Sequence, residues 1–397
     1  MSDAYFPLCF TFFGLGERLQ LRTLARRWHQ ELEASRCETG CGGVLLGRAA
    51  EKGFGGLCWR LLRMGADVNA ASRKDDLTPL MCAVFGGQLE TLDILLQGRA
   101  DVNHQNNTKC TALMLAADLG HRSILQRLLF ARADVTLHAG DSTTALTSAT
   151  QKGHFDVVEE LLHVGQEESS LADALWWAAE YGHACIVERL FHYNVNPNFV
   201  NQDGSGSAGG KALRIAAHKN NESVIDALLH GRANVNATST NGFGALAVAC
   251  QYGSHRVAHH LLASSADVNA RALNGRTPLM IASTFGHVTV VEELLCFLAD
   301  VHMRDREQNT SVLLASQSGH TRIIEALLRR NAEVNAAGQC GWTALNLAAS
   351  FGHLAAVCSL LASRADVHIF DEAQETAEMA ALANGHMEIV EVLQRAK

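Results

Sequence analysis

The sequence lacks the long apolar runs and the basic excess that point to a membrane or a nucleic acid. No stretch reaches the roughly 18 consecutive apolar residues of a membrane-spanning helix, so no membrane partner is expected. The net charge is −8, with 33 Lys and Arg against 41 Asp and Glu, which gives no electrostatic footprint for nucleic acid. The apolar residues 5–15 have no basic leader, since Asp3 is the only charge before them. A cytoplasmic or nuclear protein is therefore expected.

The chain also lacks a recognisable arrangement of catalytic residues. No Ser/His/Asp or Cys/His group stands apart from the rest of the sequence, so we predict a protein that is not an enzyme and binds no cofactor. Gly204, Gly206 and Gly209 match the spacing of a dinucleotide-binding loop, but that motif needs a preceding strand. The 11 cysteines are odd in number and dispersed, which is typical of reduced thiols in a large intracellular chain.

An alanine recurs at a nearly constant step from residue 49 to residue 381. Most steps are 33 residues, and one short step of 29 is followed by a long step of 38. The positions are Ala49, Ala83, Ala116, Ala149, Ala178, Ala216, Ala249, Ala282, Ala315, Ala348 and Ala381. A period of this length is typical of a stack of small units, none of which buries its apolar face alone.

Fixed positions around the alanine predict two helices in each unit. In eight of the eleven units a helix N-cap residue stands five residues earlier, either Asp173 or a threonine: Thr78, Thr111, Thr144, Thr277, Thr310, Thr343 and Thr376. Four residues later stands a glycine, replaced only by Asn220, which is expected to end the first helix in the left-handed conformation. A second helix then carries a pair of apolar residues such as Leu95 and Leu96. An Ala-Asp-Val-Asn turn, as at residues 66–69, leads into a long loop.

Residues 44–397 closely resemble ankyrin repeats, with Thr78-Pro79-Leu80, repeated Gly-His pairs and Asp-Val-Asn turns. The resemblance implies an all-α solenoid of helix-turn-helix units with projecting loops, whose concave face binds a target protein. A monomer is expected.

Two departures from the ankyrin pattern are visible. The histidine that the family usually has two residues before the alanine is missing, so looser loops are expected. The glycine after the second helix is often replaced, and a non-glycine residue there costs roughly 1 kcal/mol in the left-handed conformation. These replacements are Arg99, Arg132, Arg232, Ser265, Leu298 and Arg364.

Of the 19 histidines, seven occupy one repeat position directly after the glycine. Packed helices lie about 8–10 Å apart, whereas zinc ligands lie about 2 Å from the metal. One histidine in each repeat therefore cannot share an ion with the next, and we expect no metal site. A hydrogen bond at the start of the second helix is the favoured role.

Aromatic residues supply the candidate binding positions on the array. The position three residues after the alanine, at the exposed end of the first helix, is aromatic in several repeats, and further rings are expected near the same surface. The candidates are Trp176, Tyr181, Phe243, Tyr252, Phe285, Trp342 and Phe351. Exposed aromatics on one face act as binding anchors; the alternative is that they cover the neighbouring repeat.

Residues 1–43 do not follow the repeat. Leu21, Leu24 and Trp28 share one face of an amphipathic helix, which is expected of a cap over the first unit. The segment also resembles an F-box, the motif that binds the adaptor of a cullin-type ubiquitin ligase. The matching residues are Phe10, Phe13, Leu15, Leu19, Leu21, Leu24 and Trp28, the last preceded by Arg26-Arg27. Pro7 departs from the motif, because it falls where the first F-box helix should run.

Three smaller features complete the organisation. Residues 204–210 are Gly- and Ser-rich and are predicted to be a flexible extension of one loop. Cys37 and Cys41, beside several glycines, are predicted to lie in a linker. In the last unit, residues 376–397, Glu378 and Gln394 replace apolar residues and indicate a polar C-terminal cap.

Two functions remain open at this point. The first is a substrate-recruiting subunit of a ubiquitin ligase, which binds the adaptor through its N-terminus and a target through the array. The alternative is a stand-alone ankyrin scaffold or inhibitor with no ubiquitin role.

Overall fold

The computed structural model describes residues 41–72, 74–200 and 207–396, which form two units. The boundary lies between Ser170 and Leu171. The described residues contain 22 α-helices and one short 3-10 helix, and no strand. The predicted all-α class is therefore confirmed. None of the helices in this part of the chain is long and apolar enough to cross a bilayer.

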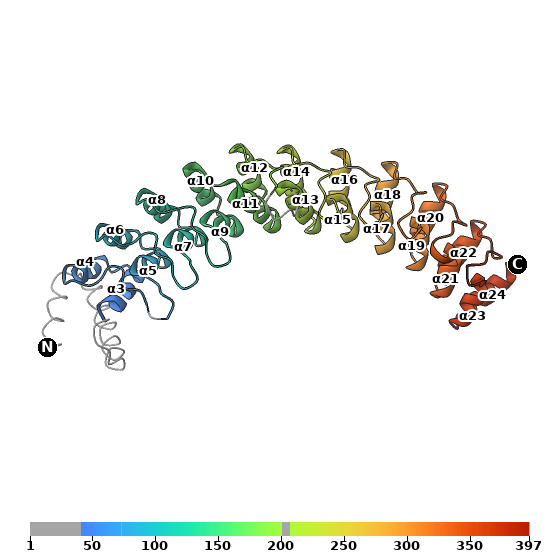
Figure 1. The fold of residues 1–397 in the computed structure, drawn as a ribbon, viewed down its shortest axis with the longest axis horizontal. Coiled ribbons are helices and arrows are strands. Elements are labelled where there is room, and N and C mark those ends of the chain that lie inside the picture. The colour runs from blue at the N-terminus through green and yellow to red at the C-terminus, as the bar shows by residue number, and fades with distance from the viewer. Residues whose placement is uncertain (1–40, 73, 201–206, 397) are drawn as a thin grey trace. The chain divides into compact units, whose positions relative to one another are not determined.

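In each unit the helices form two rows, one of first helices and one of second helices (Figure 1). In the first unit the first helices are α3 (Cys41–Glu51), α5 (Pro79–Phe85), α7 (Ala112–Asp118) and α9 (Ala145–Lys152). The second helices are α4 (Gly55–Arg63), α6 (Leu89–Gln97), α8 (Arg122–Phe130) and α10 (Phe155–Val164).

The second unit repeats this arrangement. Its first helices are α11 (Glu168–Tyr181), which begins just before the boundary, α13 (Ala208–His218), α15 (Ala245–Tyr252), α17 (Pro278–Phe285), α19 (Ser311–Gln317), α21 (Ala344–Ser350) and α23 (Ala377–Ala383). Its second helices are α12 (Ala184–His192), α14 (Glu222–His230), α16 (His255–Ala263), α18 (Val288–Cys296), α20 (Thr321–Arg329), α22 (Leu354–Ala362) and α24 (Met387–Arg395). The 3-10 helix η1 (Gln339–Gly341) lies in the loop before α21.

The recurring alanine is the centre of each repeat. All eleven copies, from Ala49 to Ala381, have no exposed surface. The leucine that faces them from the second helix, as at Leu95 or Leu294, is equally buried. A methyl group at the alanine position allows consecutive first helices to pack closely, which is why the residue type is constant while its neighbours vary.

The predicted helix ends are confirmed, with one exception. Each threonine at the N-cap position accepts a hydrogen bond from the backbone N–H three residues later, as Thr78 does from Met81 at 3.3 Å. The glycines at the end of the first helices have φ between 70° and 80°. Asp173 is the exception, because it lies inside α11. The repeat before it lacks a long loop, so α11 starts at Glu168, where a carboxylate favours the first turn.

The repeated histidines tie each repeat to the one before it. The Nε2 of His320 donates to the carbonyl oxygen of Thr284 at the end of the previous first helix, at 3.1 Å. His154, His287, His353 and His386 make the same bond at 3.0 or 3.1 Å. The prediction of a hydrogen bond is confirmed, but its partner lies in the neighbouring repeat. These bonds satisfy helix-end carbonyls that otherwise lack a partner.

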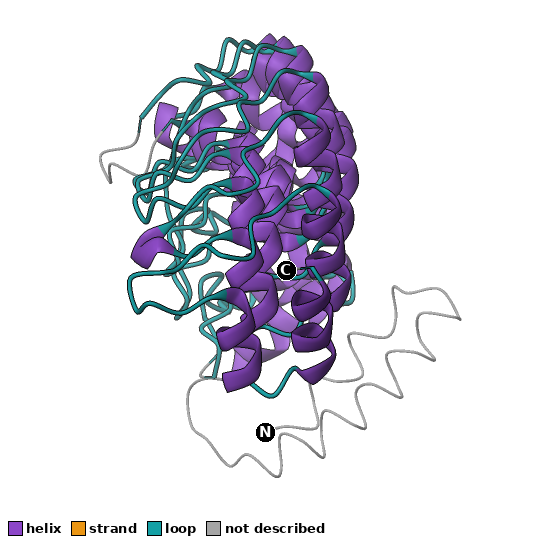
Figure 2. Cartoon of the chain, turned by 90° about the vertical axis from the view of Figure 1, so that its right-hand side faces the viewer, coloured by secondary structure: helices purple, strands orange, loops and turns teal. Residues whose placement is uncertain are grey.

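The loops between repeats lie on one side of the helices (Figure 2) and are linked to one another. In the second unit, the backbone N–H groups of Leu273, Arg306, Gln339 and Glu372 donate to carbonyls of the preceding loop at 3.0–3.1 Å. In the Ala-Asp-Val-Asn turns, the Asn side chain accepts the next repeat's N–H, as Asn269 does from Asp300 at 2.9 Å. The loops are therefore joined without the missing family histidine, contrary to the expectation of looser loops.

Two predictions about glycine-rich segments are wrong. Residues 207–210 do not belong to a flexible extension, because Ser207 caps α13 and Gly209 and Gly210 are buried in its first turn. A Cβ on Gly210 would lie 2.6 Å from the Cβ of Ala237, so glycine serves close packing there. Cys41 starts helix α3 rather than lying in a linker. Gly43, two residues further along that helix, leaves room for Ala70 in the same way.

The residues after the second helices adopt the expected left-handed conformation. The residues that replace glycine after the second helices, from Arg99 to Arg364, have φ between 61° and 67°. The side chain of Gln394 donates a hydrogen bond to Glu378 at 2.9 Å, so the two polar residues of the last unit contact each other.

The F-box-like residues Phe10, Phe13, Leu15, Leu19, Leu21, Leu24 and Trp28, with Cys37, lie outside the described residues.

Candidate protein-binding surface

The first helices of the second unit and their loops form the surface that carries all seven predicted aromatic residues. We call it the first-helix face, made of α11, α13, α15, α17, α19, α21 and α23 with the loops before them. Consecutive members of this row from α13 to α23 pack against each other. A residue at a fixed repeat position therefore comes to lie beside its counterpart in the next repeat.

Four of the predicted rings are half exposed at one repeat position. The exposed fractions are 51% for Tyr181, 52% for Tyr252, 50% for Phe285 and 51% for Phe351. Each ring ends a first helix or directly follows one. This agrees with the prediction that they stand at the exposed end of the helix. About half of each residue's surface is therefore exposed.

Histidine rings support these aromatics from one side. Phe285 stacks on His287 and Phe351 on His353, with ring centroids 6.4 Å apart in both pairs. Tyr181 stacks on His183 at the same distance. Tyr252 differs, because its ring meets the edge of His218 from the previous repeat at 4.4 Å. Tyr181 also stacks on Trp177 of its own helix at 5.7 Å. Each of the four rings thus has a ring neighbour while its residue stays half exposed.

The remaining three candidates are half buried. Trp176 and Phe243 meet Tyr252 in one open pocket of about 440 Å³, which also contains Lys211 and Arg214. Trp342 follows η1 and takes the repeat position of Phe243, one residue before the N-cap threonine. The structure therefore brings three of the seven predicted residues together and spreads the others along the first-helix face.

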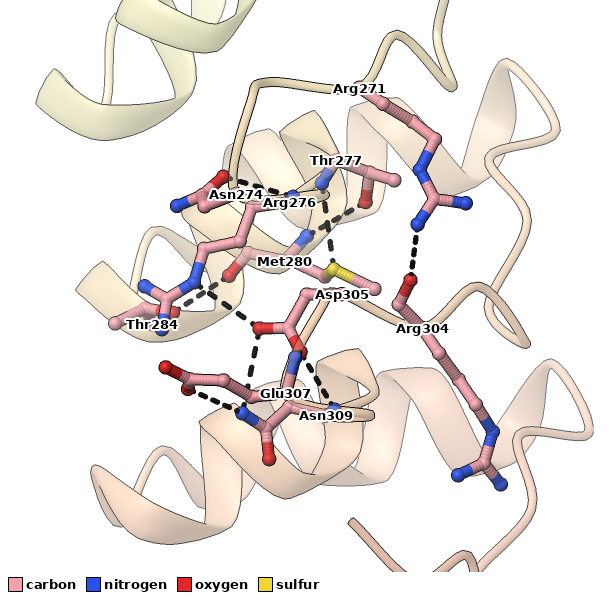
Figure 3. Close-up of polar contacts among 10 residues, drawn as sticks. All are labelled: Arg271, Asn274, Arg276, Thr277, Met280, Thr284, Arg304, Asp305, Glu307 and Asn309. Atoms are coloured by element: carbon pink, nitrogen blue, oxygen red, sulfur yellow. Dashed lines mark hydrogen bonds and ion pairs between the residues drawn. The ribbon is translucent and has the colours of Figure 1, made fainter. Parts of the chain in front are cut away.

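Polar contacts hold two adjacent loops that border this face, those before α17 and α19 (Figure 3). The carboxylate of Asp305, only 3% exposed, accepts the backbone N–H groups of Glu307 and Asn309 at 2.9 and 2.8 Å. Arg276 of the preceding loop pairs with the same carboxylate at 3.4 Å. Arg271 donates to the carbonyl of Arg304 at 2.6 Å. These contacts fix the loop beside α17 and α19, so the aromatic face has a pre-organised border.

The family-model comparison identifies the repeats. A model described as ankyrin repeats, three copies, matches the chain in overlapping segments at residues 46–139, 123–201, 175–272, 213–305, 266–338 and 312–397. The chain is an ankyrin-repeat protein. A comparison of the sequence with curated proteins gave no match. Ankyrin repeats are protein-interaction units, so the array is a protein–protein interaction module.

Within the ankyrin array, basic side chains line the pocket near Tyr252. Among the residues that the structure describes, its lining contains Lys211, Arg214 and His218 and no Asp or Glu. Burial lowers the pKa of the Arg214 guanidinium from its usual value, although an arginine stays charged at neutral pH. Lys219, one residue beyond α13, forms an ion pair with Glu180 at 2.7 Å. Basic side chains therefore gather at this pocket in a chain whose net charge is −8.

The sequence prediction missed the basic members of this pocket and several exposed apolar side chains. Phe85 is 63% exposed at the end of α5, Phe130 is 86% exposed at the end of α8, and Leu298 is 79% exposed after α18. The sequence offers one signal for this basic group, because Arg214 occupies the repeat position that holds Met114 in an earlier repeat. In residues 41–72, 74–200 and 207–396, no three His, Cys, Asp or Glu side chains are grouped to hold a metal ion.

Proposed function

We propose that the protein holds a target protein on the first-helix face of its second unit. Tyr181, Tyr252, Phe285 and Phe351 act as the anchors. Their half-exposed rings at one repeat position, supported by histidine, are the observation that carries the proposal. A few residues contribute most of the binding energy at protein interfaces, and aromatic residues are frequent among them, because they bury a large area with little loss of side-chain entropy.

The test compares partners recovered from cell extract by three full-length chains. One is wild type, one carries Phe285→Ala and Phe351→Ala, and the control carries Phe130→Ala, which removes an exposed ring from the second-helix row. We expect the double variant to lose the principal partner and the control to keep it. Equal recovery by all three chains would contradict the proposed surface, provided that circular dichroism shows the same helix content.

As a second candidate, we propose that the captured protein is a ubiquitin-ligase substrate. The sequence of residues 10–28 supports this role, through the apolar residues Phe13, Leu15 and Leu19 and the ending Arg26-Arg27-Trp28. The test is co-purification of the full chain with the ligase adaptor. A complex lost on Leu19→Asp or Trp28→Ala is the expected result. Failure to form a complex at micromolar concentration would leave the stand-alone ankyrin scaffold or inhibitor as the function.

A further inference from the structure

The loops before α19 and before α23 each bury an aspartate, but only the first aspartate is paired with a cation. Asp305 and Asp371 stand at the same repeat position, five residues before the N-cap threonine, and they are 3% and 5% exposed. Arg276 of the preceding loop pairs with Asp305 at 3.4 Å (Figure 3). Trp342 takes the repeat position of Arg276 in the loop that precedes Asp371. Among the described residues, no basic side chain pairs with Asp371.

The carboxylate of Asp371 also accepts fewer hydrogen bonds than that of Asp305. Asp305 accepts two backbone N–H groups of its own loop. Oδ1 of Asp371 accepts one, from Glu375 at 2.8 Å, and Oδ2 has no hydrogen-bond or ion-pair partner among the described residues. Burial of a carboxylate is costly unless the group is paired and hydrogen-bonded. A donor from a partner protein therefore gains most at Oδ2 of Asp371.

The backbone brings Trp342 next to Asp371 in the same way as it brings Arg276 next to Asp305. In both places the preceding residue is a glycine with a left-handed φ, and a Cβ built on it would lie 3.2 or 3.3 Å from Cα of the aspartate. In both places the backbone N–H that follows the aspartate donates to the preceding loop, at 3.1 or 3.0 Å. Trp342 therefore stands to Asp371 as Arg276 stands to Asp305.

The surroundings of this site are acidic. Residues 365–394 contain seven Asp and Glu and no Lys or Arg. Glu372 and Glu375 are exposed, and neither forms an ion pair with a described residue. Trp342 is partly exposed, and its ring has no hydrogen bond or ring neighbour in the described part of the chain. An arginine complements this combination, because its guanidinium pairs with a carboxylate and stacks on an aromatic ring.

We infer that Asp371 and Trp342 bind an arginine side chain from a basic segment of the target protein. This inference rests on the proposed function and adds to it the chemistry of the segment that reaches the last loops of the first-helix face. Lysine is disfavoured, because its ammonium group has no planar surface to lay on the ring. A divalent cation is disfavoured, because no three His, Cys, Asp or Glu side chains among the described residues are grouped to hold one.

The experiment selects binders from a library of random dodecapeptides displayed on phage, with the full chain as bait. Trp342→Arg copies Arg276 and supplies the cation from within the chain, whereas Asp371→Asn removes the charge. The matched control is Glu391→Gln, which removes an exposed carboxylate from α24 of the same repeat. We expect wild type and control to enrich peptides that contain arginine. A synthetic copy of one such peptide should bind each of the two site variants roughly 10-fold or more weakly, as expected when a hydrogen-bonded charge loses its partner.

Four results would overturn the inference. They are selected peptides without an excess of arginine, equal affinity of wild type and either site variant, an equal loss of affinity in Glu391→Gln, and saturable Ca²⁺ binding that Asp371→Asn abolishes. Failure of the inference differs from failure of the proposed function. In the first case Phe285→Ala with Phe351→Ala still abolishes partner recovery from extract, while in the second case it does not.

Discussion

The contact between the repeated glycine and the next repeat's histidine gives a quantitative prediction. Gly286 has a φ of 80°, and a Cβ built on it would lie 2.5 Å from Cε1 of His320. Gly286→Ala therefore brings two costs. The left-handed conformation costs a non-glycine residue about 1–2 kcal/mol. Displacement of His320 also breaks its bond to the Thr284 carbonyl, worth about 1 kcal/mol. We expect a loss of about 2–3 kcal/mol of local stability.

Gly87 provides the matched control. Its φ is 70°, but the nearest atoms of His121 would lie 3.4 Å from a new Cβ, which is a tolerable contact. Gly87→Ala therefore brings only the backbone cost, about 1–2 kcal/mol. Asn220, with a φ of 54° at the same repeat position, shows that the array accepts a non-glycine residue there.

Hydrogen exchange followed by mass spectrometry is the appropriate assay, because repeat arrays open locally and a single unfolding transition averages over repeats. Peptides that cover α17 and α20 should exchange faster in Gly286→Ala than peptides around α5 do in Gly87→Ala. In a His320→Ala background the cost of Gly286→Ala should fall by about 1 kcal/mol. Equal costs in both backgrounds would show that the contact with His320 adds nothing to the cost of Gly286→Ala.

Three further predictions concern single side chains. Asn346 is 2% exposed, and its Nδ2 has no hydrogen-bond partner among the described residues. Asn346→Leu, which copies Leu313 at the same repeat position, should therefore raise the free energy of unfolding in urea by about 1–3 kcal/mol. An unchanged or lower midpoint would contradict this. Leu298→Gly should raise stability by about 1 kcal/mol because Leu298 is exposed with a φ of 63°, whereas Leu298→Ala, which keeps the strained backbone, should not. Burial raises the pKa of the Cys58 thiol to about 12 and that of the Cys82 thiol to about 11, so both thiols stay protonated at pH 8. Both should therefore resist maleimide, while the exposed Cys185, Cys296 and Cys358 should react, as read by peptide mapping. Rapid labelling of Cys58 would contradict the packing of α4.

The sequence predicted the features that depend on one residue type at one place. Threonine caps, the buried alanine and the left-handed glycines follow from local backbone chemistry, and the structure confirms them. Asp173 shows the limit, since a good N-cap residue lies inside α11 when the loop that should precede it is absent. Gly209 and Gly210 show the same limit. Only their neighbours in the fold, Pro197 and Ala233 for Gly209 and Ala237 for Gly210, reveal that these glycines serve close packing.

Contacts between repeats were harder to predict. The histidines bond to backbone carbonyls 36 residues earlier, as at Thr284 and Gln317. Every residue has a backbone carbonyl, so the residue type does not reveal which one accepts the bond. The pocket near Tyr252 was missed for another reason. Arg214 and His218 come from one repeat, while Phe243 and Tyr252 come from the next, so the group exists only once the repeats are stacked.

The most direct test of the account is a binding titration of the principal recovered partner against the full chain. Wild type, Phe285→Ala with Phe351→Ala, and Phe130→Ala are compared at fixed salt. We expect the double variant to bind roughly 30-fold or more weakly, the effect of losing a strong interface anchor, and Phe130→Ala to match wild type. Equal affinity of the double variant and wild type would show that the target binds elsewhere than the first-helix face.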